Sequence, residues 1–172
     1  IKPEVLFADL DGKFTQISTF YTDSINTENG NHNMKLSMER VNGTILNPGD
    51  IFSFNGIVGD STTTDTGFLP AGGLSGGVSV QMVGGGICQS STTIYGAAIR
   101  AGLEITMREC HSLESAYVPT GLDATVDYGN IDFQFRNNMK TPIYIATWMD
   151  GVRLHATIFG VQPEEWDRIE VS

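Results

Sequence analysis

The stretch of sequence that decides the fold is GGGICQSSTTIYGAAIRAGLEI, which runs from Gly84 to Ile105. Three glycines lead into a cysteine, Cys88, and a run with helical periodicity follows it. Four apolar residues of this run recur at helical spacing, namely Ile94, Ala97, Ala98 and Ala101. Because these residues share one helical face and a glycine follows them, the spacing predicts a helix over residues 90–101. The small alanines indicate that this helix packs closely against a sheet or another helix.

The segments around this helix carry strand and turn signals. Residues 14–22, 51–54, 103–107 and 131–135 are rich in the aliphatic, aromatic and Thr residues typical of strands. Residues 142–159 predict a hairpin around Asp150 and Gly151. Residues 33–43 predict a short amphipathic helix, with a polar loop before it, and the glycine-rich residues 61–77 predict a long irregular loop. We therefore expect an α+β fold, in which an antiparallel-rich sheet packs on one or two helices and the central helix follows the glycine-rich, cysteine-containing loop.

Composition restricts the classes of partner. The chain has 172 residues, 40% hydrophobic content and a net charge of −10, which describes an acidic globular protein. Its ten Lys and Arg residues are scattered, so nucleic acid is excluded as a partner. No run reaches the roughly 18 apolar residues of a membrane span. The opening segment has no signal-peptide pattern and reads as a fragment of something longer, so we expect a signal, an anchor or a further domain upstream.

Cys88 is the first candidate for chemistry. A thiolate at a helix start is stabilised by unpaired backbone N–H groups, which lowers the thiol pKa. The same donors stabilise the oxyanion that forms when a thiolate attacks a carbonyl carbon, and glycines let the backbone approach a substrate. The candidate substrate and oxyanion contacts are Gly85, Gly86, Gln89, Ser90, Ser91 and Tyr117.

Two downstream residues complete a candidate catalytic set. His111 lies in the run ECHS and suits a general base, and Asp123 lies in GLDATV and suits the acid that orients the imidazole. Each of these residues also has an ordinary structural interpretation. Cys88 resembles a small buried apolar residue, His111 a surface or capping residue, and Asp123 a turn residue.

The second cysteine leaves further alternatives open. A Cys88–Cys110 disulfide would block the thiol, whereas a redox role for the pair lacks the usual CxxC spacing. The spacing matches no zinc motif, so we expect no metal and no cofactor, although Cys88, Cys110 and His111 could meet a metal if the fold gathers them. For His32 and His155 we expect structural or surface roles.

The ordered motifs LNPGDIFSFNGIVG, GGGICQSSTTIYGAAIRAGLEI, CHS, YVPTGLDATVDYG and DFQFRNN closely resemble the VanW-like domain family. The resemblance implies one domain over residues 1–160, followed by a tail over residues 161–172. It also implies a bacterial, exported or envelope-anchored protein in a cell-wall context, in a family named for vancomycin-resistance clusters. The Cys88 segment is also similar to transglutaminase-like and papain-like cell-wall hydrolases, which implies Cys88 as nucleophile, His111 as base and Asp123 as orienting acid.

These observations lead to competing functional hypotheses. The first is a peptidoglycan-acting enzyme that cuts or exchanges a stem-peptide amide with Cys88, or that cleaves the glycan strand as a lytic transglycosylase with a carboxylic acid. The candidate acids for glycan cleavage are Asp123, then Asp65 and Glu109. The second is a non-catalytic peptidoglycan-binding module, with a groove lined by Phe52, Phe54, Phe68, Tyr117 and Tyr128.

Overall fold

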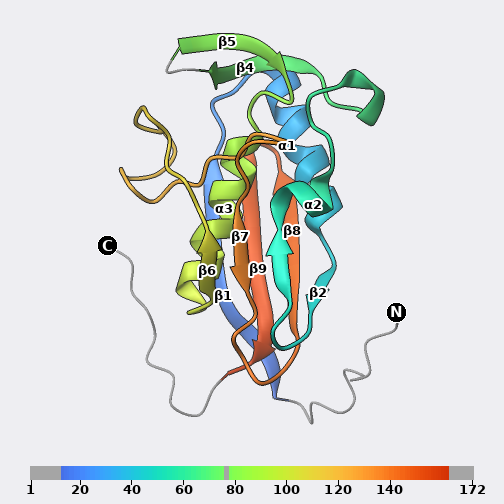
Figure 1. The fold of residues 1–172 in the computed structure, drawn as a ribbon, viewed down its shortest axis with the longest axis vertical. Helices are drawn as coiled ribbons and strands as arrows, with labels where there is room; N and C mark the ends of the chain where they lie inside the picture. Colours follow the sequence, from blue (N-terminus) through green and yellow to red (C-terminus); the bar gives the residue numbers. More distant parts are fainter. Residues whose placement is uncertain (1–12, 76–77, 163–172) are drawn as a thin grey trace.

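The computed structural model describes residues 13–75 and 78–162 and confirms the α+β fold (Figure 1). Its elements in chain order are β1 (Phe14–Asp23), α1 (Glu28–Val41), β2 (Thr44–Leu46), β3 (Ile51–Ser53), α2 (Phe54–Val58), the short 3₁₀ helix η2 (Thr64–Thr66), β4 (Pro70–Ser75), β5 (Val78–Val83), α3 (Ile87–Arg100), β6 (Glu104–Met107), β7 (Gln134–Arg136), β8 (Ile143–Asp150) and β9 (Arg153–Val161).

The strands form three antiparallel sheets. The main sheet has the order β1-β9-β8-β2, a second sheet has the order β3-β7-β6, and β4 pairs with β5. The predicted hairpin is confirmed as β8 and β9, which turn at Gly151 with a positive φ of 58°. α3 packs against β1 and β9, whereas α1 packs against β8 and α3. The prediction of an antiparallel sheet on two helices is therefore confirmed.

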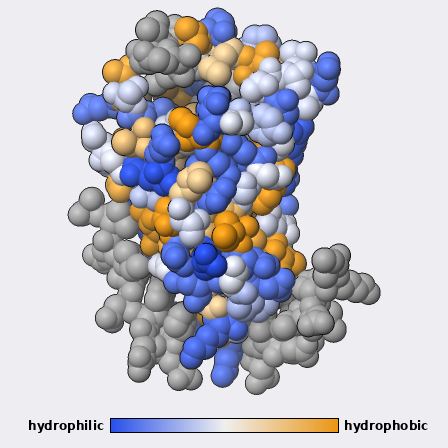
Figure 2. All heavy atoms as spheres, viewed as in Figure 1, coloured by the Kyte–Doolittle hydropathy of each residue, from blue (hydrophilic) through white to orange (hydrophobic). Residues whose placement is uncertain are grey.

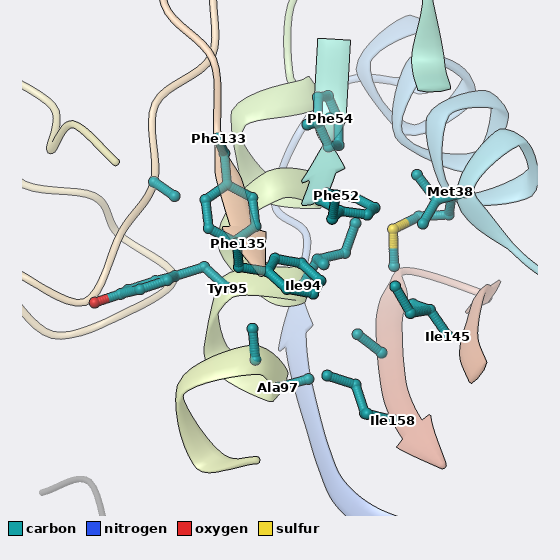
Figure 3. Close-up of a cluster of buried hydrophobic side chains, with 14 of the residues drawn as sticks. Met38, Phe52, Phe54, Ile94, Tyr95, Ala97, Phe133, Phe135, Ile145 and Ile158 are labelled. Atoms are coloured by element: carbon teal, nitrogen blue, oxygen red, sulfur yellow. The ribbon is translucent and has the colours of Figure 1, made fainter. Parts of the chain in front are cut away.

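The core lies where α1, α3, the main sheet and the second sheet meet (Figure 3). Phe52 of β3 stacks on Phe135 of β7 with ring centroids 4.6 Å apart, and Tyr95 of α3 meets Phe133 edge-on at 5.7 Å. Such aromatic pairs add roughly 0.5–1.5 kcal/mol each beyond the area that they bury. Three of the aromatic residues considered for a binding groove, Phe52, Phe54 and Phe68, are fully buried and are core residues instead.

The strand predicted over residues 131–135 is present only as β7, Gln134–Arg136, and three further predictions also differ from the structure. α1 begins at Glu28, inside the run predicted to be a loop, because the Thr27 side chain caps the helix by accepting a hydrogen bond from the N–H of Gly30. α3 begins at Ile87, three residues earlier than predicted. The long irregular loop predicted over residues 61–77 is wrong, since it contains η2 and β4. The glycines of β4 are typical of loops, so the sequence did not indicate this strand, which pairs with β5 through backbone hydrogen bonds.

Within residues 13–75 and 78–162, no helix is both long enough and apolar enough to cross a membrane. β9 continues to Val161, and the rest of the predicted tail, residues 163–172, lies outside the described part of the chain, as does the opening segment up to residue 12.

Gly96 lets α3 approach β1 closely. A Cβ atom at this position would lie 2.1 Å from Cδ1 of Phe20, whose ring is also stacked on Arg100. We expect Gly96→Ala to destabilise the fold by up to about 2 kcal/mol, because the overpacking cost of roughly 1–3 kcal/mol outweighs the gain of about 1 kcal/mol in helix propensity. Urea denaturation measures the change. The loss should shrink when Gly96→Ala is combined with Phe20→Leu, and stabilisation by Gly96→Ala alone would contradict the packing account.

Candidate functional site

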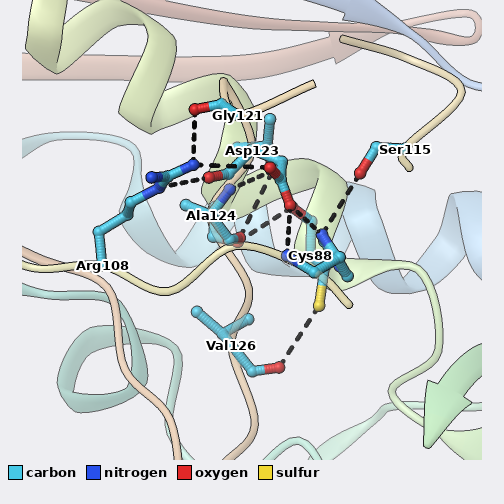
Figure 4. A network of polar contacts seen from close by, with 10 residues as sticks. Cys88, Arg108, Ser115, Gly121, Asp123, Ala124 and Val126 are labelled. Carbon is cyan, nitrogen blue, oxygen red and sulfur yellow. Dashed lines mark hydrogen bonds and ion pairs between the residues drawn. The ribbon is translucent and has the colours of Figure 1, made fainter. Parts of the chain in front are cut away.

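Cys88 is the second residue of α3 and carries the thiol at the start of the helix (Figure 4). Gly86 precedes the helix as its N-cap with a φ of 101°, a conformation that residues other than glycine rarely adopt. The Cys88 thiol donates to the carbonyl oxygen of Val126 at 3.4 Å. Neither Cys88 nor Cys110 is in a disulfide, and Cys110 is exposed.

The glycine turn before Cys88 packs against the protein's own backbone. A Cβ atom on Gly85 would lie 2.4 Å from the carbonyl oxygen of Ala71 in β4. The Gly85 carbonyl accepts a hydrogen bond of 2.9 Å from the buried Asn33 side chain of α1. Asn33 also bonds both the N–H and the carbonyl group of Leu69. The space that the missing side chain leaves at Gly85 is therefore filled by the backbone of β4. The turn before Cys88 is held in place by the side chain of Asn33 in α1.

The segment that contains Asp123 is hydrogen-bonded to α3. Ser91 donates to the Ala124 carbonyl oxygen at 2.6 Å, and the Ala124 N–H donates to the Thr92 hydroxyl at 3.0 Å. Because both backbone groups of Ala124 are held by the turn that follows Cys88, the position of Asp123 relative to α3 is also fixed.

Asp123 and His111 form a tight, buried pair. His111 Nδ1 lies 2.5 Å from Asp123 Oδ2, and the same oxygen accepts the His111 backbone N–H at 2.6 Å. Both side chains are less than a tenth exposed. Ser115 Oγ lies 3.3 Å from the same ring nitrogen. The ring contacts with Asp123 and Ser115 are both made by Nδ1. The other ring nitrogen of His111, Nε2, has no hydrogen-bond partner among the described residues.

Arg108 lies on the other side of the Asp123 carboxylate. Its Nη2 is 3.5 Å from Asp123 Oδ1 and donates to the Gly121 carbonyl oxygen at 2.6 Å, while its Nε donates to the Asp123 carbonyl oxygen at 2.7 Å. The guanidinium carbon lies 5.1 Å from the centre of the Tyr95 ring. Sequence reasoning did not include Arg108, although it lies only three residues before His111.

Two pKa shifts define the electrostatics of the site. Burial raises the pKa of the Cys88 thiol to about 11, and the negative charges of Asp127 and Asp123 add to this rise. This direction is opposite to the expectation for a helix start, because desolvation outweighs the helix dipole. For Asp123, burial works against ionisation, but hydrogen bonds from the His111 backbone and side chain outweigh it and lower the pKa. The resting site therefore holds a neutral thiol beside an ionised carboxylate.

Tyr117 lies close to the same face of α3. Burial raises the pKa of Tyr117 to about 12, and the negative charge that Cys88 carries once it is ionised adds to this rise, while the side chains of Ser115 and Thr92 partly oppose it. Cys88 and Thr92 are four residues apart and share one helical face. Tyr117 therefore stays protonated near the thiol and contributes to its burial.

The other predicted site residues point elsewhere. Gln89 donates to Thr22 of β1 at 3.0 Å, and Ser90 accepts from Ser37 of α1 at 2.8 Å. These contacts direct both side chains into the protein interior, away from an oxyanion. Asp65 lies in η2, and Glu109 is exposed with its carbonyl bonded to the N–H of Thr125. The described residues contain no cluster of three or more His, Cys, Asp or Glu side chains suited to a metal ion.

Comparison with known proteins places the chain in a family. Residues 29–159 match the protein-family model described as VanW like protein. The chain is 37% identical over 144 residues to the Bacillus subtilis (strain 168) protein YoaR, covering 84% of this chain and 46% of that protein. It is 30% identical over 142 residues to the vancomycin B-type resistance protein VanW of Enterococcus faecalis (strain ATCC 700802 / V583), covering 80% of this chain and 51% of that protein.

The chain therefore belongs to the VanW-like family, as its motifs predicted. It spans about half the length of these two curated relatives. No solved structure shows significant similarity to the chain.

The two free thiols give an internal comparison of reactivity. At pH 7.5 we expect iodoacetamide to modify exposed Cys110 at least about 100-fold faster than Cys88, because a thiol with a pKa near 11 supplies far less thiolate than an ordinary cysteine. Tyr117→Ala should accelerate modification of Cys88, whereas Tyr117→Phe, which keeps the ring, should do so much less. Peptide mass spectrometry over time measures both sites at once. Faster modification of Cys88 than of Cys110 would contradict the burial account.

Asp123 should make stability depend on pH. Its pKa is lowered in the folded protein, so the carboxylate contributes stability that is present above its unfolded pKa of about 3.9 and lost as the pH falls through the lower folded value. We expect Asp123→Asn to be clearly less stable than the parent chain at pH 7, and the difference to shrink at pH 3. Urea denaturation at both pH values measures the difference. An equal difference at both would show that the hydrogen bonds of Asp123 do not depend on its charge.

Proposed function

We propose that the chain is a cell-wall enzyme that transfers an acyl group from a stem-peptide amide of peptidoglycan through Cys88. The observation that carries the proposal is the buried Asp123–His111 pair, with 2.5 Å between Oδ2 and Nδ1. A carboxylate that holds Nδ1 fixes the imidazole with Nε2 available to accept a proton, which is the role of the orienting acid in Cys-His-Asp sites.

The proposed reaction uses the thiol of Cys88 and the imidazole of His111. His111 Nε2 accepts the Cys88 thiol proton while the sulfur attacks the amide carbonyl carbon, which forms a C–S bond. The C–N bond then breaks, and the imidazolium returns the proton to the leaving amine. Water or another amine attacks the resulting thioester, and Cys88 regains its proton. A general base is needed here because the pKa of Cys88 is raised to about 11.

The start of α3 supplies the donors for the oxyanion. The N–H groups of Ile87 and Gln89 are already bonded to the carbonyls of Gly84 and Gly86. The backbone N–H of Cys88 is therefore the first candidate donor for the substrate oxygen. The Tyr117 hydroxyl, which is held neutral, is the second candidate.

The cell-wall assignment rests on the family. The family resemblance implies a cell-wall context, and the name of the Enterococcus faecalis relative connects that protein with vancomycin resistance. We accordingly propose that the chain acts outside the bacterial cytoplasm, at the envelope, on peptidoglycan. Whether water or an amine accepts the acyl group decides between a hydrolase and a transferase.

The glycan-cleaving alternative receives less support. A lytic transglycosylase or glycosidase needs a carboxylic acid that stays protonated at the working pH. Burial favours the protonated form of Asp123, but its hydrogen bonds to His111 lower the pKa and hold the side chain ionised. Asp123 is therefore suited to orient His111 and poorly suited to protonate a glycosidic oxygen.

A non-catalytic wall-binding module remains the second candidate, since one observation favours it. Cys88 is partly buried, packs against the hydrophobic core and donates to a backbone carbonyl, as a packing cysteine does. On that account, His111 and Asp123 stabilise the loop that follows β6, and the chain binds wall material without changing it.

Digestion of purified peptidoglycan with product analysis by mass spectrometry separates these functions. We expect new peptide ends or exchanged cross-links from the parent chain, a loss of at least about 10³-fold with Cys88→Ala, and a loss of about 10²–10⁴-fold with Asp123→Asn. Cys110→Ala is the matched control and should keep full activity. Anhydro-sugar ends that survive Cys88→Ala would move the chemistry to the glycan. Normal wall binding without products would favour the binding module.

A further inference from the structure

We infer that Arg108 is a positioning residue of this site, which fixes the plane of the Asp123 carboxylate so that one of its two oxygens faces His111. The inference rests on the proposed function for its effect on turnover. Its geometric claim concerns the folded protein alone and is tested separately.

The two carboxylate oxygens of Asp123 have separate partners. Oδ2 takes both hydrogen bonds from His111, and Oδ1 lies 3.5 Å from Arg108 Nη2. Because an aspartate carboxylate rotates easily about its last bond, two contacts on one oxygen do not by themselves fix its plane. A cation beside the other oxygen does, and Arg108 is the only Lys or Arg residue in the described part of the chain within 4 Å of Asp123.

Arg108 is itself held in place. Its fork donates to the backbone carbonyls of Asp123 and Gly121, at 2.7 and 2.6 Å, and its guanidinium carbon lies 5.1 Å from the centre of the Tyr95 ring of α3. Arginine provides this combination through its planar set of donors, which lysine lacks. Arg108 thus contacts a core residue, the backbone of the Asp123 segment and the Asp123 carboxylate.

The orientation of the Asp123 carboxylate decides which ring nitrogen of His111 carries the proton. With Oδ2 held at Nδ1, the neutral imidazole carries its proton on Nδ1, and Nε2 is left as the acceptor. If the carboxylate rotates away, Ser115, 3.3 Å from Nδ1, can donate to that nitrogen and favour the opposite tautomer. The opposite tautomer has no acceptor at Nε2 and cannot remove a thiol proton.

The test is ¹⁵N NMR of the histidine side chains above pH 8 in the parent chain, Arg108→Gln and Arg108→Lys. His111 is assigned by comparison with His32→Gln and His155→Gln variants. We expect a single Nδ1–H tautomer in the parent chain, loss of that single tautomer in Arg108→Gln, and partial retention in Arg108→Lys, which keeps the charge. A single Nδ1–H tautomer in folded Arg108→Gln would overturn the inference. If Arg108→Gln does not fold, an unaltered tautomer in Arg108→Lys overturns it.

Arg100→Gln is the matched control. Arg100 also stacks on an aromatic ring, 4.2 Å from the centre of Phe20, and donates to the Gly96 carbonyl oxygen, but it forms no ion pair with a carboxylate in the described part of the chain. We expect Arg100→Gln to keep the His111 tautomer whatever its effect on stability, and a tautomer change there would overturn the assignment to Arg108. In the wall assay, Arg108→Gln should lower kcat by tenfold or more, up to the roughly 10⁴-fold loss that a wrong tautomer causes, with KM nearly unchanged. An inactive parent chain that nevertheless shows the expected tautomers would refute the proposed function and leave the role of Arg108 intact.

Discussion

Burial of α3 on nearly all sides is the constraint on which the rest of the structure depends. Its polar residues from Gln89 to Thr93 are all buried, so each needs a hydrogen-bond partner, and each finds at least one in another part of the chain. β1 supplies Thr22 and α1 supplies Ser37, while the segment after residue 121 supplies the backbone of Ala124. These partners set where β1, α1 and the Asp123 segment lie.

The candidate site follows from the same constraint. Once Ala124 is fixed on α3, its neighbour Asp123 lies beside the helix start, where His111 and Arg108 can reach its carboxylate. The position of Cys88 is set by the preceding glycine turn, whose Gly85 carbonyl accepts a hydrogen bond from Asn33. The site thus combines residues from distant parts of the chain, and its electrostatics follow from enclosure, which keeps the thiol neutral while hydrogen bonds keep Asp123 ionised.

Local patterns allowed much of the fold to be predicted. The periodicity of residues 90–101 and the Asp150-Gly151 turn encode α3 and the last hairpin, because both depend on neighbouring residues. The early start of α1 was not predicted, because the polar residues around its cap are typical of loops, and β4 was not predicted, because its glycines are also typical of loops. For the site, chain order suggested His111 and Asp123, which the structure brings together. Arg108, Ser115 and the inward direction of Gln89 were not predictable, since they depend on how the segment after β6 closes onto α3.

The most direct test of a Cys88 nucleophile is the search for its acyl intermediate. The chain is mixed with soluble peptidoglycan fragments, quenched in acid within seconds, and examined by intact-mass and peptide mass spectrometry. The account predicts an adduct with the mass of the acyl part of the stem peptide, carried by Cys88 and not by Cys110, and released by hydroxylamine as a thioester is. Turnover of the fragments without any adduct on Cys88, and at the same rate in Cys88→Ala, would contradict the account.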